Sequence, residues 1–282
     1  MARGAVVISG SSTGIGRACA LRLDRSGFRV FAGVRKREDG ESLRAEARGE
    51  LEPLILDVTD LSSIAAARRR VEEAAGSAGV AGLVNNAGIA IAGPLEFVPI
   101  DDFRRQLEVN LIGHVAVIQA FLPLIRKARG RIVNMTSIGG RVASAFLGPY
   151  QSSKWALEGL TDALRKELRP WGIDVVAIEP GAISTPLWQK DVDEANQMIE
   201  QLPPEGHELY GEAIGKVSEF AVKLGERGSP PDRVARSVEH ALTARRPRTR
   251  YLVGADARVQ LALGKMLPAR TGDAIEARLI GL

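Results

Sequence analysis

Tyr150 and Lys154 are the pair of residues in this sequence with the clearest chemical use. Four residues make about one helical turn, so both side chains can point from one helix face into the same cleft. A free tyrosine loses its proton near pH ~10, and a nearby ammonium favours the phenolate and lowers that pKa. An isolated Tyr-x-x-x-Lys is more often a solvated helix face, so the elements around it decide. With that support, the pair predicts a phenol that exchanges a proton near neutral pH.

A glycine-rich turn near the amino end supplies a second candidate site. A short β-branched run at 5–8 leads into Gly-x-x-x-Gly-x-Gly, and a helical pattern follows until Gly27. Glycines let the backbone approach a pyrophosphate closely, and a helix N-terminus offers free N–H groups. This placement favours a dinucleotide site over a purely structural turn. The expected contacts are Gly10, Ser12, Thr13, Gly14, Ile15 and Gly16.

The end of the second predicted strand, 29–33, bears on which dinucleotide binds. An acidic side chain there would bond the adenosine ribose of NAD, whereas an arginine accommodates the 2′-phosphate of NADP. The strand end has no carboxylate and is followed by Arg35. Arginine is always charged and can bind phosphate through two parallel bonds, so NADP(H) is favoured and NAD(H) is the alternative. A merely solvated Arg35 is the competing interpretation.

Two further predicted strands, 54–58 and 82–88, end in polar or small residues. Asp57, with Val58 beside it, is expected either at the adenine edge of the cofactor or as a cap of the next turn, before a helix at 61–75. The fourth strand runs into Asn86, Ala87 and Gly88. Open α/β sheets bind ligands at the carboxyl ends of their strands, so these three residues are expected to line the cofactor cleft.

Ser137 directly follows a fifth predicted strand, 131–136, and lies thirteen residues before Tyr150. That strand delivers the serine to the sheet edge that holds the glycine turn and Asn86. A helical pattern at 101–126 precedes it, and Asn110 interrupts its apolar stripe. A buried amide needs partners, so Asn110 either bends the helix and holds a water or is satisfied by backbone groups.

The residues after a sixth strand, 173–178, complete the expected cofactor site. This strand ends at Pro180 and Gly181, and the turn behind it contains Ile183 and Thr185. That turn is expected to close over the nicotinamide, whose carboxamide Thr185 would bond.

The last third of the chain is predicted to decide what binds. Residues 187–228 mix apolar and polar side chains and read as an irregular substrate lid. A helix that begins near 229–232 and a seventh strand, 251–254, follow. The C-terminal extension, 256–282, contains an apolar helix at 257–267 that would pack on a partner subunit, on the lid or on a membrane surface.

Bulk properties predict one soluble domain spanning residues 1–282. The single Cys19 cannot form an internal disulfide, the start leaves no room for a signal peptide, and no apolar run has membrane-spanning length. A cytoplasmic location is therefore expected. The formal charge is +4 and the isoelectric point about 9.4. The basic residues are scattered, which favours solvated helix faces over a nucleic-acid surface. No metal site is predicted.

Taken together and in order, these motifs resemble the short-chain dehydrogenase/reductase family. The resemblance implies an α/β fold, a doubly wound seven-stranded parallel sheet of Rossmann type with helices on both faces, and hydride transfer between NAD(P) and a carbonyl or alcohol. It departs at Ser9, where a threonine is usual. The residues that carry it are Gly10, Gly14, Gly16, Asn85, Asn86, Ala87, Gly88, Asn110, Ser137, Tyr150, Lys154, Pro180 and Gly181.

The resemblance also implies a role for each catalytic residue. Tyr150 would be the general acid and base, and Lys154 would lower its pKa and bind the nicotinamide ribose. Ser137 would hydrogen-bond the substrate oxygen as charge develops on it. Asn110 would hold a water that links Lys154 to solvent.

The tail from 250 to 258 and the apolar helix after it are similar to the retinol and hydroxysteroid dehydrogenase branch of that family. This similarity suggests a bulky apolar alcohol or ketone, such as a steroid, retinoid or lipid-like ketone. The alternatives are another carbonyl class, either an acyl-linked or a sugar ketone, and a scaffold that binds NADP(H) without turnover. A homodimer or homotetramer with peripheral membrane contact at most is expected.

Overall fold

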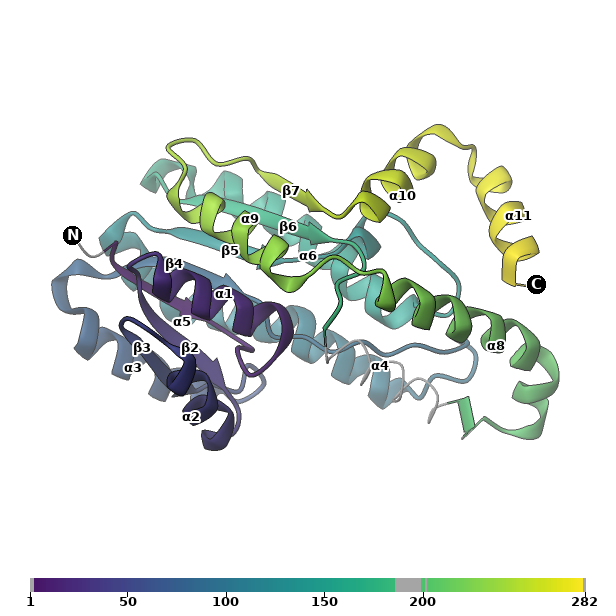
Figure 1. Ribbon diagram of the computed structural model, residues 1–282, viewed down its shortest axis with the longest axis horizontal. Coiled ribbons are helices and arrows are strands. Elements are labelled where there is room, and N and C mark those ends of the chain that lie inside the picture. The colour runs from purple at the N-terminus through teal and green to yellow at the C-terminus, as the bar shows by residue number, and fades with distance from the viewer. Residues whose placement is uncertain (1–2, 186–198, 201, 281–282) are drawn as a thin grey trace.

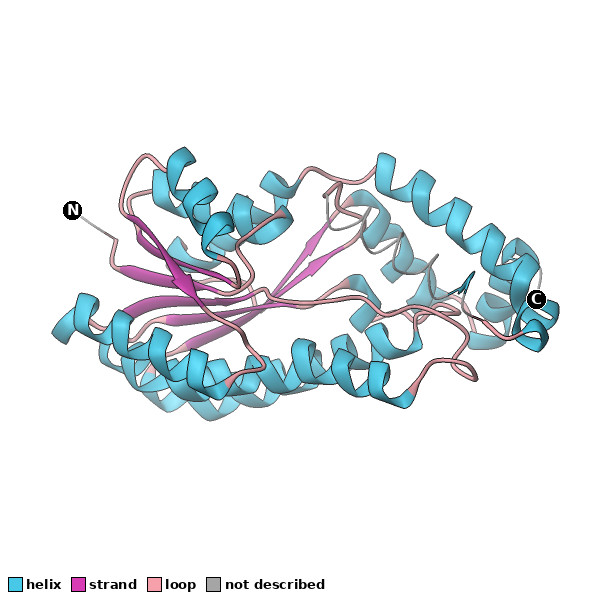
Figure 2. Ribbon diagram, turned by 90° about the horizontal axis from the view of Figure 1, so that it is seen from below, coloured by secondary structure: helices cyan, strands magenta, loops and turns pink. Residues whose placement is uncertain are grey.

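The computed structural model describes residues 3–185, 199–200 and 202–280. Seven parallel strands form one sheet in the order β3-β2-β1-β4-β5-β6-β7. Helices cover both of its faces (Figure 2), which confirms the predicted doubly wound fold. The strands are β1 (Ala5–Ile8), β2 (Arg29–Val34), β3 (Leu51–Ile55), β4 (Val80–Asn85), β5 (Arg131–Met135), β6 (Asp174–Pro180) and β7 (Arg250–Val253).

The strand order reverses between β1 and β4, and this reversal places the candidate site. The connections that follow β1 and β4 lead to opposite sides of that pair, which leaves a crevice between the carboxyl ends of the two strands. Open α/β sheets bind ligands in such a crevice. The predicted glycine turn follows β1, and the predicted asparagine follows β4.

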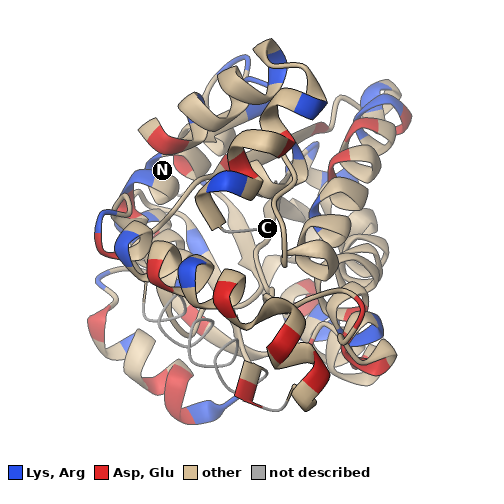
Figure 3. Ribbon diagram, turned by 90° about the vertical axis from the view of Figure 1, so that its right-hand side faces the viewer, with Lys and Arg blue, Asp and Glu red and all other residues tan. Residues whose placement is uncertain are grey.

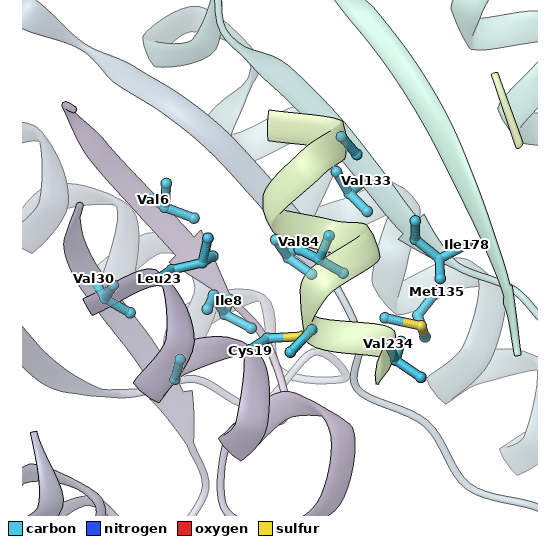
Figure 4. Packing of buried hydrophobic residues seen from close by; sticks show 14 of the residues in the cluster. Val6, Ile8, Cys19, Leu23, Val30, Val84, Val133, Met135, Ile178 and Val234 are labelled. Carbon is cyan, nitrogen blue, oxygen red and sulfur yellow. The ribbon is translucent and has the colours of Figure 1, made fainter. Parts of the chain in front are cut away.

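Two buried apolar layers hold the helices on the sheet. On one face, α1 (Gly14–Arg25), α2 (Arg37–Glu46) and α9 (Pro231–Thr243) pack on the strands, with Cys19, Leu23 and Val234 against β-branched residues (Figure 4). On the other face lie α3 (Leu61–Ala75), α5 (Gly113–Ala128) and α6 (Gly148–Leu168). Strands buried on both faces read as continuous apolar runs, which is why they were visible in the sequence.

The helix predicted at 101–126 is present but is not uniform. It consists of α4 (Ile100–Leu107), a π-helical turn η2 (Glu108–Ile112) and α5. The whole run is long and apolar enough to span a membrane, contrary to the prediction that no such segment exists. Its inward side chains, among them Val117 and Phe121, are fully buried against the sheet, as expected of a core helix.

The third strand lies earlier than predicted, at Leu51–Ile55 rather than 54–58. It contains Pro53, which has no N–H for the ladder. A proline is tolerated because β3 is an edge strand that pairs only with β2. Asp57 and Val58 therefore belong to the loop after the strand.

The segment predicted as an irregular lid contains one long helix, α8 (Pro204–Glu226), so that part of the prediction was wrong. Few side chains of α8 are buried, among them Ala213 and Ile214, so the sequence shows only a weak helical periodicity of apolar residues there. Residues 186–198 and 201 of the predicted lid lie outside the described residues. The predicted C-terminal helix is present as α10 (Ala255–Met266), and α11 (Ala269–Ile280) was not predicted. These helices lie at the end of the molecule opposite the N-terminus (Figure 1).

Candidate active site

The glycine turn has a backbone that only glycine fits. Gly10 and Gly14 have positive φ angles of 67° and 56°. A Cβ atom on Gly16 would lie 2.0 Å from the carbonyl oxygen of Gly10 and 2.5 Å from Nδ2 of Asn86. The turn is therefore held close to the first turn of α1, as a pyrophosphate-binding turn requires. Ser12 and Ile15 are half-buried beside it, and Thr13 is exposed at the start of α1.

Asn86 ties β4 to this turn. Its Nδ2 donates to the carbonyl oxygens of Ser9 and Gly10 at 3.1 and 2.9 Å. The Ser9 hydroxyl in return accepts from the backbone N–H groups of Asn86 and Ala87 at 3.0 and 3.1 Å. The serine therefore supplies the hydroxyl that the family usually takes from threonine. Ala87 and Gly88 follow at the same sheet edge and are half-buried.

Asn110 sits in the π-helical turn and is fully buried. Its amide oxygen accepts from the N–H of Ile89 at 2.9 Å, and its Nδ2 donates to the Ile89 carbonyl at 2.9 Å and to Ser153 Oγ at 3.2 Å. The helix is distorted at this turn, and the amide is satisfied largely by backbone groups, which is the second alternative raised by the sequence; the water of the first alternative stays a prediction. The bonds fasten this turn to the loop after β4 and to α6.

Tyr150, Lys154 and Ser137 are brought together at the carboxyl ends of β5 and β6. Lys154 is buried, and its Nζ donates to the Met135 carbonyl at 2.9 Å and lies 5.7 Å from the centre of the Tyr150 ring. Ser137 Oγ accepts from the Gly139 N–H at 3.0 Å and lies 3.5 Å from the Pro180 carbonyl. A Cβ on Gly139 would meet both Tyr150 and Ser137, at 3.4 and 3.5 Å. Three chain segments thus meet around one small volume.

Burial sets the charge state of Lys154. It lowers the pKa of Lys154 to about 8, and the carboxylate of Glu158 opposes this shift. The side chain is therefore still an ammonium at neutral pH. An ammonium at this distance favours the phenolate of Tyr150 over the phenol.

The sequence did not single out His114, which is fully buried near Lys154. Its Nε2 lies 2.7 Å from the carbonyl oxygen of Ala87. A carbonyl only accepts, so Nε2 carries the proton, and Nδ1 is left as a buried acceptor without a partner among the described residues. Burial, and then the Lys154 charge, lower the pKa of His114 to about 3, so the ring is neutral. The sequence feature that could have revealed His114 is its position: it is a polar residue on the inward face of the otherwise apolar helix α5.

The loop after β6 reaches back to the glycine turn. The Gly181 N–H donates to the Val253 carbonyl at 2.9 Å, and Ile183 forms a β-bridge with Ser229. A Cβ on Gly14 would lie 3.3 Å from the side chain of Thr185. The predicted nicotinamide segment and the predicted pyrophosphate turn are therefore neighbours.

The two residues predicted at the adenosine end differ in their contacts. Arg35 directly follows β2 and is exposed at the carboxyl edge of the sheet. Asp57 accepts from the N–H and hydroxyl of Thr59 at 2.9 and 2.7 Å, which is the capping alternative. Val58 is buried in the apolar layer under α5.

Comparison with known proteins agrees with this geometry. Residues 4–196 match the family model described as short chain dehydrogenase. Retinol dehydrogenase 5 of Mus musculus is 40% identical over 276 residues, which cover 96% of this chain and 86% of that protein. The 17-beta-hydroxysteroid dehydrogenase type 6 of Bos taurus is 40% identical over 279 residues, 97% of this chain and 87% of that protein.

A solved short chain dehydrogenase from Burkholderia cenocepacia, in complex with NADP, superposes with a TM-score of 0.73 at 25% identity and covers 99% of both chains. The family model matches well over half of the sequence, and the fold, the glycine turn and the pairing of Tyr150 with the buried Lys154 agree with it. The chain therefore belongs to the short-chain dehydrogenase family, as an oxidoreductase that uses a nicotinamide cofactor on alcohol and carbonyl groups.

Proposed function

We propose that this chain interconverts a bulky apolar alcohol, of retinoid or steroid type, and its carbonyl compound with NADP(H). The observation that carries the proposal is the buried Lys154 ammonium beside the Tyr150 ring, next to Ser137 and the glycine turn. The two relatives named for retinol and 17-beta-hydroxysteroid oxidation support the substrate class, since each is similar over nearly the whole chain.

The residues present fit a dinucleotide. The close approach of Gly16 to Gly10 leaves room for a pyrophosphate at the N-terminus of α1, and Thr185 lies beside Gly14, where the nicotinamide end would be held. Arg35 would bind the 2′-phosphate. The bound cofactor supplies or accepts the hydride.

The side chains of the protein transfer the hydroxyl proton of the substrate and hydrogen-bond its oxygen. Tyr150 holds or receives the hydroxyl proton of the alcohol, and Lys154 favours the phenolate that accepts it. Ser137 donates a hydrogen bond to the same oxygen. Asn110 holds the π-helical turn beside Ser153, and we assign it the water that leads protons from Lys154 to solvent.

An aromatic cluster supports an apolar substrate. Tyr210 of α8 meets Phe97 and Phe146 edge-on, each with ring centres 6.0 Å apart, and its hydroxyl donates to Glu96 at 2.9 Å. Phe146 lies four residues before Tyr150 and has a positive φ of 65°, a strained backbone held by the Gly93 N–H at 2.7 Å. The cluster joins α8 to the loops that precede α4 and α6.

A panel of substrates tests the proposal. Retinol, a 17-hydroxysteroid, a short aliphatic alcohol, a sugar alcohol and an acyl-linked hydroxy ester are each incubated with the protein and NADP, and nicotinamide absorbance is followed. We expect kcat/KM for retinol or the steroid to exceed that of the other substrates by at least about 100-fold, since burying each methylene contributes about 0.8 kcal/mol. Preference for the sugar or the acyl-linked compound would contradict the proposed substrate class.

Replacing Arg35 with Asp tests the cofactor assignment. The change removes a charge-assisted contact to the 2′-phosphate and adds a repulsive carboxylate, so we expect NADPH affinity to fall by about 10- to 100-fold. NADH affinity should change by less than about threefold. Cofactor binding is measured by fluorescence titration, with Arg69→Asp as the control, because that residue makes the same charge change on the exposed face of α3. Equal loss of both cofactors would show that Arg35 does not contact the phosphate.

Location and assembly stay predictions. On the side of the molecule seen in Figure 3, basic and acidic residues are interspersed along the helices, as expected of solvated faces. Arg68 and Arg70 of α3 pair with Glu72 and Glu52 at 2.9 and 2.6 Å. These pairs support a small-molecule substrate over a nucleic-acid partner. A cytoplasmic location and a homodimer or homotetramer remain to be tested.

A further inference from the structure

A buried ionic cluster lies directly behind the proposed active site. It consists of Arg141, Glu158, Glu179 and Arg250, with Asp162 at its edge. Arg141 pairs with Glu179 at 2.7 Å, and Arg250 contacts Glu158, Glu179 and Asp162 at 3.0, 3.3 and 2.8 Å. The side chains of Glu158 and Glu179 are only 7% and 2% exposed. Two partly exposed guanidinium groups thus face two buried carboxylates and the more exposed carboxylate of Asp162.

Three members of the ionic cluster belong to segments that form the proposed active site. Glu158 is one helical turn beyond Lys154 on α6. Arg141 ends the short 3-10 turn η3 (Ile138–Gly140) that begins at Ser137. Glu179 precedes Pro180, whose carbonyl lies 3.5 Å from the Ser137 hydroxyl. The ion pairs therefore join the segments of Lys154 and Ser137 from behind, and Arg250 anchors them to the edge strand β7.

The loop after Ser137 packs tightly against α6. A Cβ on Gly140 would lie 2.9 Å from the Lys154 carbonyl oxygen and 3.1 Å from Cγ of Glu158. The loop after Ser137 is therefore in contact with the backbone of α6. Movement of the Glu158 side chain would therefore displace both this loop and the backbone of α6 near Lys154.

The cluster is poorly explained as a source of stability. Buried ion pairs often contribute no more than apolar residues of the same volume, because two charges must be desolvated. One carboxylate oxygen of Glu158, Oε1, is buried with no hydrogen-bond partner among the described residues. A buried carboxylate stabilises the charged form of a nearby cation, and the buried cation one turn away on α6 is Lys154.

We propose that Glu158 is a positioning residue that keeps Lys154 protonated and aligned with Tyr150, while Arg250 holds the Glu158 carboxylate in place. The proposal rests on the roles assigned above to Tyr150 and Lys154. Burial drives Lys154 toward the neutral form, and the Glu158 charge opposes it. Without that charge, the lysine would lose its proton at lower pH.

The other charged groups near this pair come from every surrounding element. Arg250 of β7 contacts Glu158 and also pairs with Asp162 of α6 and Glu179 of β6, and Glu179 pairs in turn with Arg141 after η3. His114 of α5 is the second titratable group near Lys154, and its ring is neutral above a pH of about 3. The negative charge of Glu158 therefore offsets part of the cost of burying the Lys154 ammonium.

Glu158→Gln tests the proposal because it keeps the shape and an oxygen for Arg250 while removing the charge. We expect the alkaline limb of the pH profile of kcat/KM for alcohol oxidation to move to lower pH by about one unit. An opposite charge one helical turn away raises the pKa of a lysine by about that much, and the substitution removes this charge. The loss should be about tenfold on the alkaline side and smaller at neutral pH. Glu158→Asp keeps the charge and should restore most of the wild-type profile.

A direct titration needs no substrate. The Lys154 side chain is observed by NMR in protein with isotope-labelled lysine, assigned by comparison with Lys154→Arg, and its midpoint should fall by about one pH unit in Glu158→Gln. This measurement tests the inference even if wild type oxidises no alcohol in the substrate panel, so the two failures are distinguishable.

Glu239→Gln is the matched control. Glu239 of α9 pairs with Arg22 of α1 at 2.6 Å, on the face of the sheet opposite to α6 and Lys154. Its replacement also removes a carboxylate from an arginine pair and should leave the Lys154 midpoint and the pH profile unchanged. An unchanged Lys154 midpoint in a folded Glu158→Gln protein, judged by thermal melting, would reduce the cluster to a structural role and overturn the proposal.

Discussion

Tyr150→Phe is expected to lower kcat for alcohol oxidation by about 10²- to 10⁴-fold, the contribution of a positioned general acid or base. The substitution removes one oxygen atom and keeps the ring that lies 5.7 Å from Lys154 Nζ. The proposed pyrophosphate turn is built by Gly10, Gly14 and Gly16 and does not depend on the phenol. NADPH affinity should therefore change by less than about threefold.

Steady-state turnover and fluorescence titration of NADPH measure the two quantities separately. Tyr251→Phe is the control, because the buried Tyr251 hydroxyl contacts His240 and the Arg248 N–H, outside the proposed site. Loss of those bonds should cost about 1 kcal/mol of stability and leave turnover intact. If Tyr150→Phe kept more than about a tenth of the wild-type rate, the phenol would have no place in the mechanism.

Local spacing explains what the sequence could predict. The glycine turn, the asparagines after β4, Ser137, Tyr150 and Lys154 each stand at the end of an element whose apolar pattern is strong. Parallel strands bring such ends to one edge, so the site followed from the order of the motifs. Asn86 lies at that edge as well, where its bonds to Ser9 and Gly10 tie β4 to the glycine turn.

What the sequence did not predict depends on partners that are distant in the chain. Glu158 and Arg250 are 92 residues apart, and neither has a local pattern that marks it as buried. The start of β3 depends on its pairing with β2, which accepts Pro53 at a sheet edge. α8 buries few of its residues, so its helical period is weak even though it forms 23 residues of helix. In each case tertiary contacts decide the outcome.

Acid sensitivity through His114 is the second large effect that we expect. The folded protein holds this ring neutral, with a pKa of about 3, whereas an unfolded chain protonates it near its ordinary value of about 6.5. Below that value the unfolded state binds one more proton than the folded state, so stability falls as the pH falls, by about 1.4 kcal/mol per unit. Between pH ~7 and ~4.5 the contribution of this one ring is about 2.5 kcal/mol, because the slope reaches its full value only below the unfolded pKa.

Replacing His114 with Gln should remove that part of the acid sensitivity, because the amide does not titrate and can still donate to the Ala87 carbonyl. The free energy of unfolding is measured in urea near pH ~7 and near pH ~4.5, and the difference between these two values should shrink by about 2.5 kcal/mol. His207→Gln on the exposed face of α8 is the control and should leave the difference as in wild type. If wild type and His114→Gln lost the same free energy of unfolding between these two pH values, the His114 ring would be protonated in the folded protein at pH ~4.5. The neutral buried ring would then be ruled out.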